Sequence, residues 1–130
     1  MGRKGYLIDT NISIEYLGDV LPSKTLNMLD KILDDEFSVS VINNIELLGF
    51  SGITKHEEQV FDEFIHSAIV LGLNEDVIEQ TIELRKHYRI KLPDAIIAAT
   101  ALQNDLILIT RNTKDFDKIK SLKIIDPHQV

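Results

Sequence analysis

One helical stretch constrains this fold more than any other feature of the sequence. Residues 92–102 (LPDAIIAATAL) are apolar on every side of a helix and contain a single ionisable group, Asp94. A helix that is apolar all round is buried, so other layers of structure must enclose it. Pro93 suits the first helical position, which places Asp94 in the first turn, at the positive end of the helix dipole. An acid there commonly stabilises a helix, so Asp94 alone does not indicate a function.

Short apolar segments alternate with helical patterns along the whole chain. The segments predicted to be strands are residues 6–8, 37–41, 68–71, 106–109 and 122–125. Thr54 and Glu57 have the form of a capping box, and Asn74 can cap the next helix. That helix is expected to turn five residues inward: Val77, Ile78, Thr81, Ile82 and Tyr88. No hairpin dipeptide joins two strands, so we predict an α/β fold with an open, mostly parallel sheet of about five short strands and helices on both faces.

The composition sets limits on the kind of site the chain can build. Its 130 residues are 44% hydrophobic, as expected for a single domain, 1–130, with its own core. The absence of cysteine excludes disulfides, thiolate metal sites and a cysteine nucleophile. The four histidines lack metal-ligand spacing, so we expect no zinc site, whereas a hard cation held by oxygen atoms is compatible with the sequence.

The charge and the first residues bear on partners and location. A formal net charge of -7 argues against broad, salt-driven binding of nucleic acid, although an active site made of carboxylates would itself contribute to that charge. Residues 1–6 lead into the first strand without an apolar signal region, and no apolar run approaches the roughly 18 residues of a membrane span. We therefore expect a soluble, cytoplasmic protein that does not associate with membranes.

Four carboxylates are placed to gather at one edge of the predicted sheet. Asp9 directly follows the first strand, Glu46 lies one turn into the helix after the second, and Asp115 lies a few residues after the fourth. Asp94 heads the buried helix that leads into that fourth strand. Ligands of a doubly wound sheet bind beyond the carboxyl ends of its strands, so these acids are candidates for a common site.

Each acid also has a structural interpretation. Asp9 can cap the helix that follows it, and Asp115, three residues after Asn112, can be the acidic member of a capping pair. Glu46 is harder to explain in this way, because Ile42 shares its face of the helix and two leucines follow it. An ionised group in such apolar surroundings would need an arginine, backbone N–H groups or a metal as its partner.

A group of three or four carboxylates has a characteristic chemistry. The charges repel one another and raise their own pKa values unless a cation lies among them. Mg²⁺ or Mn²⁺ suits such a group, since both ions take oxygen ligands and keep several waters. A cation held in this way can ionise a water and stabilise the oxygens of a phosphodiester during in-line displacement. The residues therefore predict hydrolysis of a phosphate ester, with nucleic acid as the foremost substrate.

Four motifs place these acids in a recognisable order. They are LIDTN at residues 7–11, IELLG at 45–49, LPDAIIAATA at 92–101 and LITRNTKDF at 108–116. Together they resemble the PIN-domain family, in particular the VapC-type toxins of bacterial toxin–antitoxin pairs, over essentially the whole chain. The resemblance implies a metal-dependent endoribonuclease that is usually a homodimer and is inactive while its cognate antitoxin reaches into the acidic site. It does not fix the RNA target, since relatives cut transfer, ribosomal or messenger RNA.

The resemblance also implies roles for individual residues. Asp9, Glu46 and Asp94 would form the acidic triad that holds Mg²⁺, and Asp115 would be a fourth acid. Many relatives have an aspartate where this chain has Asn112, so either position 112 or position 115 would face the metal. The supporting polar groups would be Thr10, Asn11 and Thr110.

Basic residues near the expected site are few. They are Arg3, Lys4, Lys91, Arg111 and Lys114. They either contact RNA phosphate or are ordinary surface charges, and a dimer would join two such sparse patches.

Three other interpretations compete with a nuclease. An aspartate-nucleophile phosphatase needs a second aspartate two residues after Asp9, where this chain has Asn11. A phosphoacceptor receiver domain needs paired acids near the first strand, and none flanks Asp9. A PIN-like module that has kept its fold as a binding partner and lost turnover is the third. The presence of all three core acids argues against it, and metal binding that requires Asp94 would distinguish the two.

Overall fold

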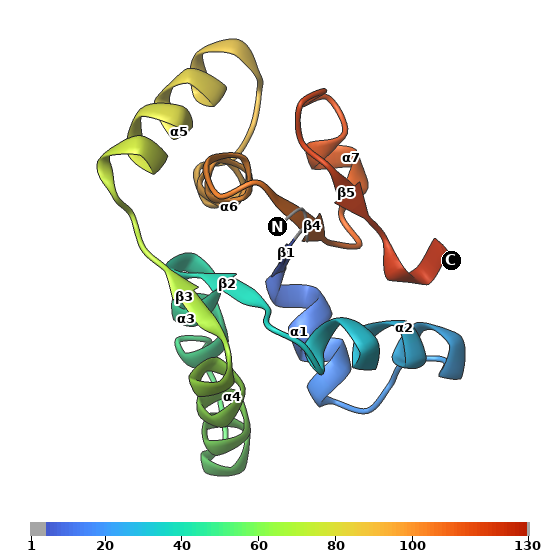
Figure 1. The fold of residues 1–130 in the computed structure, drawn as a ribbon. Coiled ribbons are helices and arrows are strands. Elements are labelled where there is room, and N and C mark those ends of the chain that lie inside the picture. Colours follow the sequence, from blue (N-terminus) through green and yellow to red (C-terminus); the bar gives the residue numbers. More distant parts are fainter. Residues whose placement is uncertain (1–4, 130) are drawn as a thin grey trace.

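A single parallel sheet lies at the centre of the computed structural model, which describes residues 5–129 (Figure 1). Its strands are β1 (Gly5–Ile8), β2 (Ser38–Ser40), β3 (Ile69–Leu71), β4 (Leu106–Ile109) and β5 (Ile124–Ile125). All neighbouring strands run parallel, in the order β3-β2-β1-β4-β5. The predicted open α/β sheet is confirmed, and its five strands lie at the five expected places, with boundaries that differ by up to two residues.

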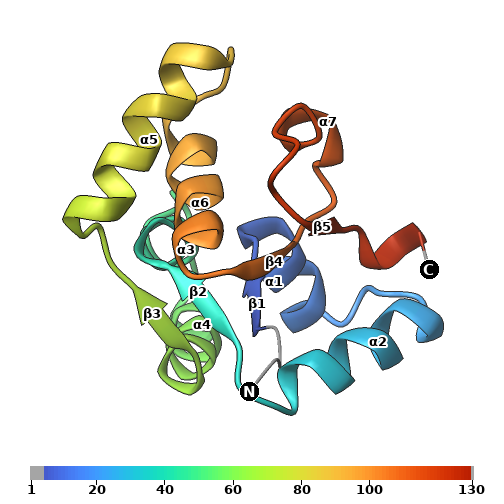
Figure 2. The same ribbon diagram turned by 45° about the horizontal axis from the view of Figure 1, so that its top comes forward.

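Helices cover both faces of this sheet (Figures 1 and 2). Within residues 5–129 the helices are α1 (Thr10–Leu17), α2 (Ser23–Leu33), α3 (Val41–Leu48), α4 (Lys55–Ser67), α5 (Glu75–His87), α6 (Leu92–Gln103), α7 (Thr113–Phe116) and the 3₁₀ turn η1 (Pro127–Gln129). The first four pack against one face, whereas α5 and α6 pack on the other. No helix of this part of the chain is both long and apolar enough to cross a membrane.

The two central strands bury both of their faces. Because successive strand residues point to opposite sides, Leu7 and Leu108 enter the core under α5 and α6, while Ile8 and Ile109 enter the core under α1–α4. These four side chains are fully buried. Paired in register, they account for strands that read as continuous apolar runs instead of alternating patterns.

Helix α6 is buried as its sequence predicts. Every residue from 95 to 101 is buried, and α6 packs along α5. The helix begins at Leu92, one residue earlier than expected, so Pro93 occupies its second position and Asp94 its third. Asp94 therefore still lies in the first turn, at the end of α6 that approaches the carboxyl edge of the sheet.

The expected inward face of α5 is wrong at two positions. Ile78 and Ile82 are 45% and 49% exposed. The buried stripe consists of Val77, Thr81 and Leu84, which recur at helical spacing. Each isoleucine lies one residue further along, about 100° around the helix, and so falls outside the stripe. The predicted caps are confirmed, since Thr54 forms its capping box and Asn74 caps α5.

We predict that Leu7→Ala lowers the free energy of unfolding by about 2–5 kcal/mol, because it leaves a cavity in the central strand. Leu73→Ala is the matched control, since Leu73 is 46% exposed, and should cost under about 1 kcal/mol. Chemical denaturation of both variants measures the difference. Equal losses would contradict the placement of Leu7 at the centre of the core.

Candidate active site

The order of the strands creates a switch point between β1 and β4. From β1 the chain continues to β2 and β3 on one side of the sheet, whereas β4 and β5 lie on the other side. In doubly wound sheets, ligands bind in the crevice that such a reversal opens beyond the carboxyl ends of the strands. Here Asp9 follows β1 and Thr110 follows β4, so the two residues face one another across this point.

Asp9 caps helix α1 and also contributes its carboxylate to the site. It is the N-cap of α1, and its Oδ1 accepts a hydrogen bond of 2.9 Å from the Thr10 backbone N–H. Its Oδ2 accepts a 2.7 Å hydrogen bond from the Thr110 hydroxyl. Asp9 is only 7% exposed, and Thr110 is fully buried. These two hydrogen bonds fix the carboxylate at the junction of the central strands.

Thr10 extends the network from Asp9 to α3. Its hydroxyl donates a 2.6 Å hydrogen bond to Glu46 Oε1 and accepts one of 2.8 Å from Asn43 Nδ2. Asn43 is fully buried, and its Oδ1 accepts from the Ser40 N–H in the capping box that starts α3. The expectation that Glu46 lies in apolar surroundings is wrong, because its side chain is exposed. The buried face of α3 consists of Asn43 and Leu47, which leaves Glu46 at the open edge of the site.

The segment after β4 continues the network on the other side. The Asn112 N–H donates a 3.0 Å hydrogen bond to the Thr110 hydroxyl, and Asn112 Nδ2 donates one of 2.7 Å to Asp115 Oδ2. Asn112 thus positions Asp115 through its side chain, not through the capping pair considered from the sequence. An unbroken chain of hydrogen bonds now links Asp115, Asp9 and Glu46.

Asp94 interacts electrostatically with the carboxylates of this network. Burial raises the pKa of Asp94, and the negative charges of Asp9, Asp115 and Glu46 raise it further, while Lys91 opposes them. Burial likewise raises the pKa of Asp9, assisted by Glu46 and opposed by the hydrogen bonds from Thr110 and Thr10. Asp9, Asp115 and Glu46 are therefore close enough to Asp94 for their charges to affect its ionisation.

The donor set matches a hard divalent cation, although its side chains do not converge. Four carboxylates with raised pKa values for Asp9 and Asp94 provide the oxygen ligands and the excess negative charge that Mg²⁺ or Mn²⁺ requires. Within residues 5–129, no three acidic or histidine side chains are arranged so that they could hold one metal ion as they stand. The site fits such an ion in chemistry and charge, and ligation would require the carboxylates to turn toward a common centre.

Other residues expected at the site are distributed differently. Asn11 is exposed and lines a shallow pocket with Arg111 instead of joining the network. Arg111 forms an ion pair of 2.7 Å with Glu15, so its charge is compensated. Lys91 lies beside Asp94, whereas Lys114 is exposed. Arg3 and Lys4, also considered from the sequence, lie outside the described residues.

Two residues of the network, Asn43 and Ser40, were not predicted from the sequence. Asn43 donates a hydrogen bond to Thr10, and Ser40 donates one to Asn43. Their three-residue spacing is that of a capping box, with asparagine where glutamate or glutamine is usual. That spacing was the available signal. Only the fold shows that the second side-chain group of Asn43 reaches Thr10.

Comparisons with known proteins agree on one family. The family model of the PIN domain matches residues 6–122. Ribonuclease VapC10 from Mycobacterium tuberculosis is 29% identical over 122 residues, which cover 90% of each chain. A toxin–antitoxin complex from Klebsiella pneumoniae contains a chain with a TM-score of 0.78 and 33% identity, over 95% of this chain and 98% of that one. VapBC-1 from nontypeable Haemophilus influenzae gives 0.78 and 28%, with the same coverage.

We predict that Asp94→Asn raises the melting temperature at pH 7 in the absence of divalent metal. The raised pKa of Asp94 means that ionisation weakens the folded state, a cost that is absent below the unfolded-state pKa near 4 and grows as pH rises toward the folded-state pKa. The gain should therefore shrink as the pH is lowered toward 4. Thermal unfolding in EDTA measures both effects.

Asp76→Asn is the matched control for that measurement. Asp76 is also a first-turn acid, but it lies exposed on α5, away from the carboxylate group. Its replacement should be neutral or cost up to about 1 kcal/mol through the helix dipole. A melting temperature of Asp94→Asn at or below that of the unaltered protein at pH 7 would contradict the destabilisation of the folded state by ionised Asp94, which burial and the neighbouring carboxylates cause.

Proposed function

Because this chain belongs to the PIN-domain family, we propose that it is a metal-dependent endoribonuclease that hydrolyses phosphodiester bonds in RNA. The observation that supports this proposal is the set of hydrogen bonds that connects Asp115, Asp9 and Glu46 at the switch point of the sheet. The charges of these three residues also act on Asp94. The similarity of this chain to a ribonuclease and to a chain of a toxin–antitoxin complex supports the same function.

The four acids are the proposed ligands of Mg²⁺ or Mn²⁺. Such a cation, when bound, lowers the pKa of water and stabilises negative charge on phosphodiester oxygens. The chain's own contribution is orientation. Thr110 and the Thr10 N–H hold the two oxygens of Asp9, and the Thr10 hydroxyl holds one oxygen of Glu46. Asn112 does the same for Asp115, which leaves the remaining lone pairs of these carboxylates available.

We also propose that the chain is the toxin of a type II toxin–antitoxin pair and acts in the cytoplasm. A cognate antitoxin would reach into the acidic site, where it would compensate the same excess of negative charge. We further propose a homodimer. Ile78 and Ile82, exposed on the outer side of α5, provide apolar surface that a second copy could cover.

The test is incubation of the purified protein, freed of any co-purifying partner, with total transfer and ribosomal RNA in Mg²⁺ or Mn²⁺. We expect discrete fragments, none in EDTA, and a cleavage rate reduced about 100-fold or more in Asp94→Asn, because removing a ligand weakens both metal binding and charge stabilisation. Asp76→Asn, with the same loss of charge on α5, should cleave at the unaltered rate.

Equal behaviour of the unaltered protein and Asp94→Asn in every condition, with folding confirmed by circular dichroism, would contradict the nuclease. The alternative of a non-catalytic PIN-like binding module would then account better for the same site.

A further inference from the structure

A cationic pocket adjoins the acidic site on the side of Asp94 and Asp115. The pocket has a volume of about 340 Å³. Its charged lining, apart from those two acids, consists of Arg85, Arg89, Lys91 and Lys118. The whole chain has only 14 lysine and arginine residues and a net charge of -7, so four cations around one pocket are a marked local concentration. Within its lining, positive charges exceed carboxylates by four to two.

Three parts of the chain build this cationic pocket. Arg85 lies in the last turn of α5, Arg89 and Lys91 lie in the connection to α6, and Lys118 follows α7. Lys118 Nζ donates a hydrogen bond to the backbone carbonyl of Arg89, which joins the two sides. Figures 1 and 2 show the α5–α6 connection, which leads into α6, and α7 at the same end of the molecule.

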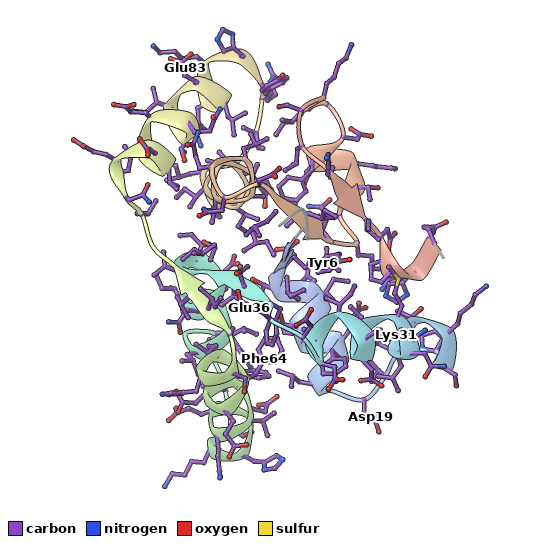
Figure 3. The ribbon with its side chains drawn as sticks, in the orientation of Figure 1. Tyr6, Asp19, Lys31, Glu36, Phe64 and Glu83 are labelled. Atoms are coloured by element: carbon purple, nitrogen blue, oxygen red, sulfur yellow. The ribbon has the colours of Figure 1, made fainter. Side chains whose placement is uncertain are left out.

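Two cations of this pocket have a partner within the protein, since Lys118 bonds the Arg89 carbonyl and Lys91 opposes the charge of Asp94, but none is held in a close ion pair by a described residue. All four side chains are exposed, and across residues 5–129 no ion pair within 4.0 Å joins any of them to a carboxylate. Nearby cations behave differently. Lys86 pairs with Glu83, which Figure 3 shows on the outer side of α5, and Arg111 pairs with Glu15. The guanidinium groups of Arg85 and Arg89 in particular are therefore available to an external anion.

The start of α6 adds to the positive character of the pocket. The N-cap of this helix is Lys91, whose side chain forms no capping hydrogen bond. Pro93 has no N–H, so the donors at this helix start are those of Leu92 and Asp94, which receive no capping side chain and lie at the positive end of the helix dipole. Guanidinium groups such as those of Arg85 and Arg89 can bind phosphate oxygens in a bidentate manner.

We propose that this pocket binds a phosphate of single-stranded RNA that neighbours the phosphodiester addressed by the acidic site. The inference rests on the proposed function. Asp94 and Asp115 belong to both the pocket and the carboxylate group, so the two adjoin and one extended anionic ligand can reach both. A nucleic-acid strand is such a ligand, because it carries an anion at every nucleotide. An acidic segment of a partner protein would bring an anion to the cationic pocket but no phosphodiester to the acidic site, so RNA is the occupant that suits both.

The experiment compares two double variants that each remove two positive charges. Arg89→Gln/Lys118→Gln alters the pocket, and Lys86→Gln/Lys120→Gln alters exposed positions outside it. Binding of a short fluorescein-labelled single-stranded RNA of mixed sequence is followed by anisotropy in EDTA at several salt concentrations. Cleavage of total transfer and ribosomal RNA in Mg²⁺ is measured in parallel.

The pocket variant should bind the labelled RNA on the order of tenfold more weakly, and its slope of log affinity against log salt should become shallower by about 0.7 for each RNA phosphate that the protein no longer neutralises. The control variant should change little in both respects. Should the pocket variant fail to fold, Arg85→Gln against Lys86→Gln makes the same comparison with single changes.

The outcomes separate this inference from the proposed nuclease. Equal weakening in both double variants, or none in either while the unaltered protein cleaves RNA, would overturn the phosphate pocket and leave the nuclease intact. The second result would instead favour an acidic protein segment as the occupant. An unaltered protein that neither binds nor cleaves RNA would overturn both.

Discussion

The hydrogen bond from the Thr110 hydroxyl to Asp9 Oδ2 is the contact on which the site depends. It joins the carboxyl ends of β1 and β4, the two strands between which the order of the sheet reverses. Through Asp9 it is continuous with Thr10 and Glu46 on one side, and through Asn112 with Asp115 on the other. Because Thr110 is fully buried and Asp9 nearly so, this hydrogen bond is shielded from water and holds the Asp9 carboxylate in place within the site.

Much of the fold follows from local patterns that the packing reinforces. Residues 106–109 and 92–102 are so apolar that burial is expected for them, and residues 95–101, 108 and 109 are buried, whereas Leu92 at the start of α6 is exposed. The choice between neighbouring apolar residues was harder. Ile78 and Ile82 have the same spacing as Val77 and Thr81, so periodicity alone could not show which pair faces α6. The family resemblance, drawn from four motifs, is confirmed by the match of the PIN-domain model.

The sequence predicted those site residues that are acidic and also lie shortly after a strand. Asp9 directly follows β1 and Asp115 lies in the short segment after β4, so the parallel topology predicts that both lie at one edge of the sheet. Glu46 was assigned to the same edge, but its exposure depends on which side of α3 packs inward. The cations of the pocket come from the end of α5, the connection after it and the segment after α7. Nothing in their spacing along the chain indicates that these parts meet, because the tertiary fold alone brings them together.

Paramagnetic Mn²⁺, which broadens the NMR signals of nearby nuclei, tests most directly whether the four carboxylates form one cation site. Substoichiometric Mn²⁺ should first remove the backbone amide signals of Thr10, Asp94 and residues 110–115, since these surround the carboxylates. Signals at the opposite edge, where Glu36 and Asp105 border another pocket, should persist. Equal broadening at both edges, or broadening spread over the acidic surface, would contradict the account.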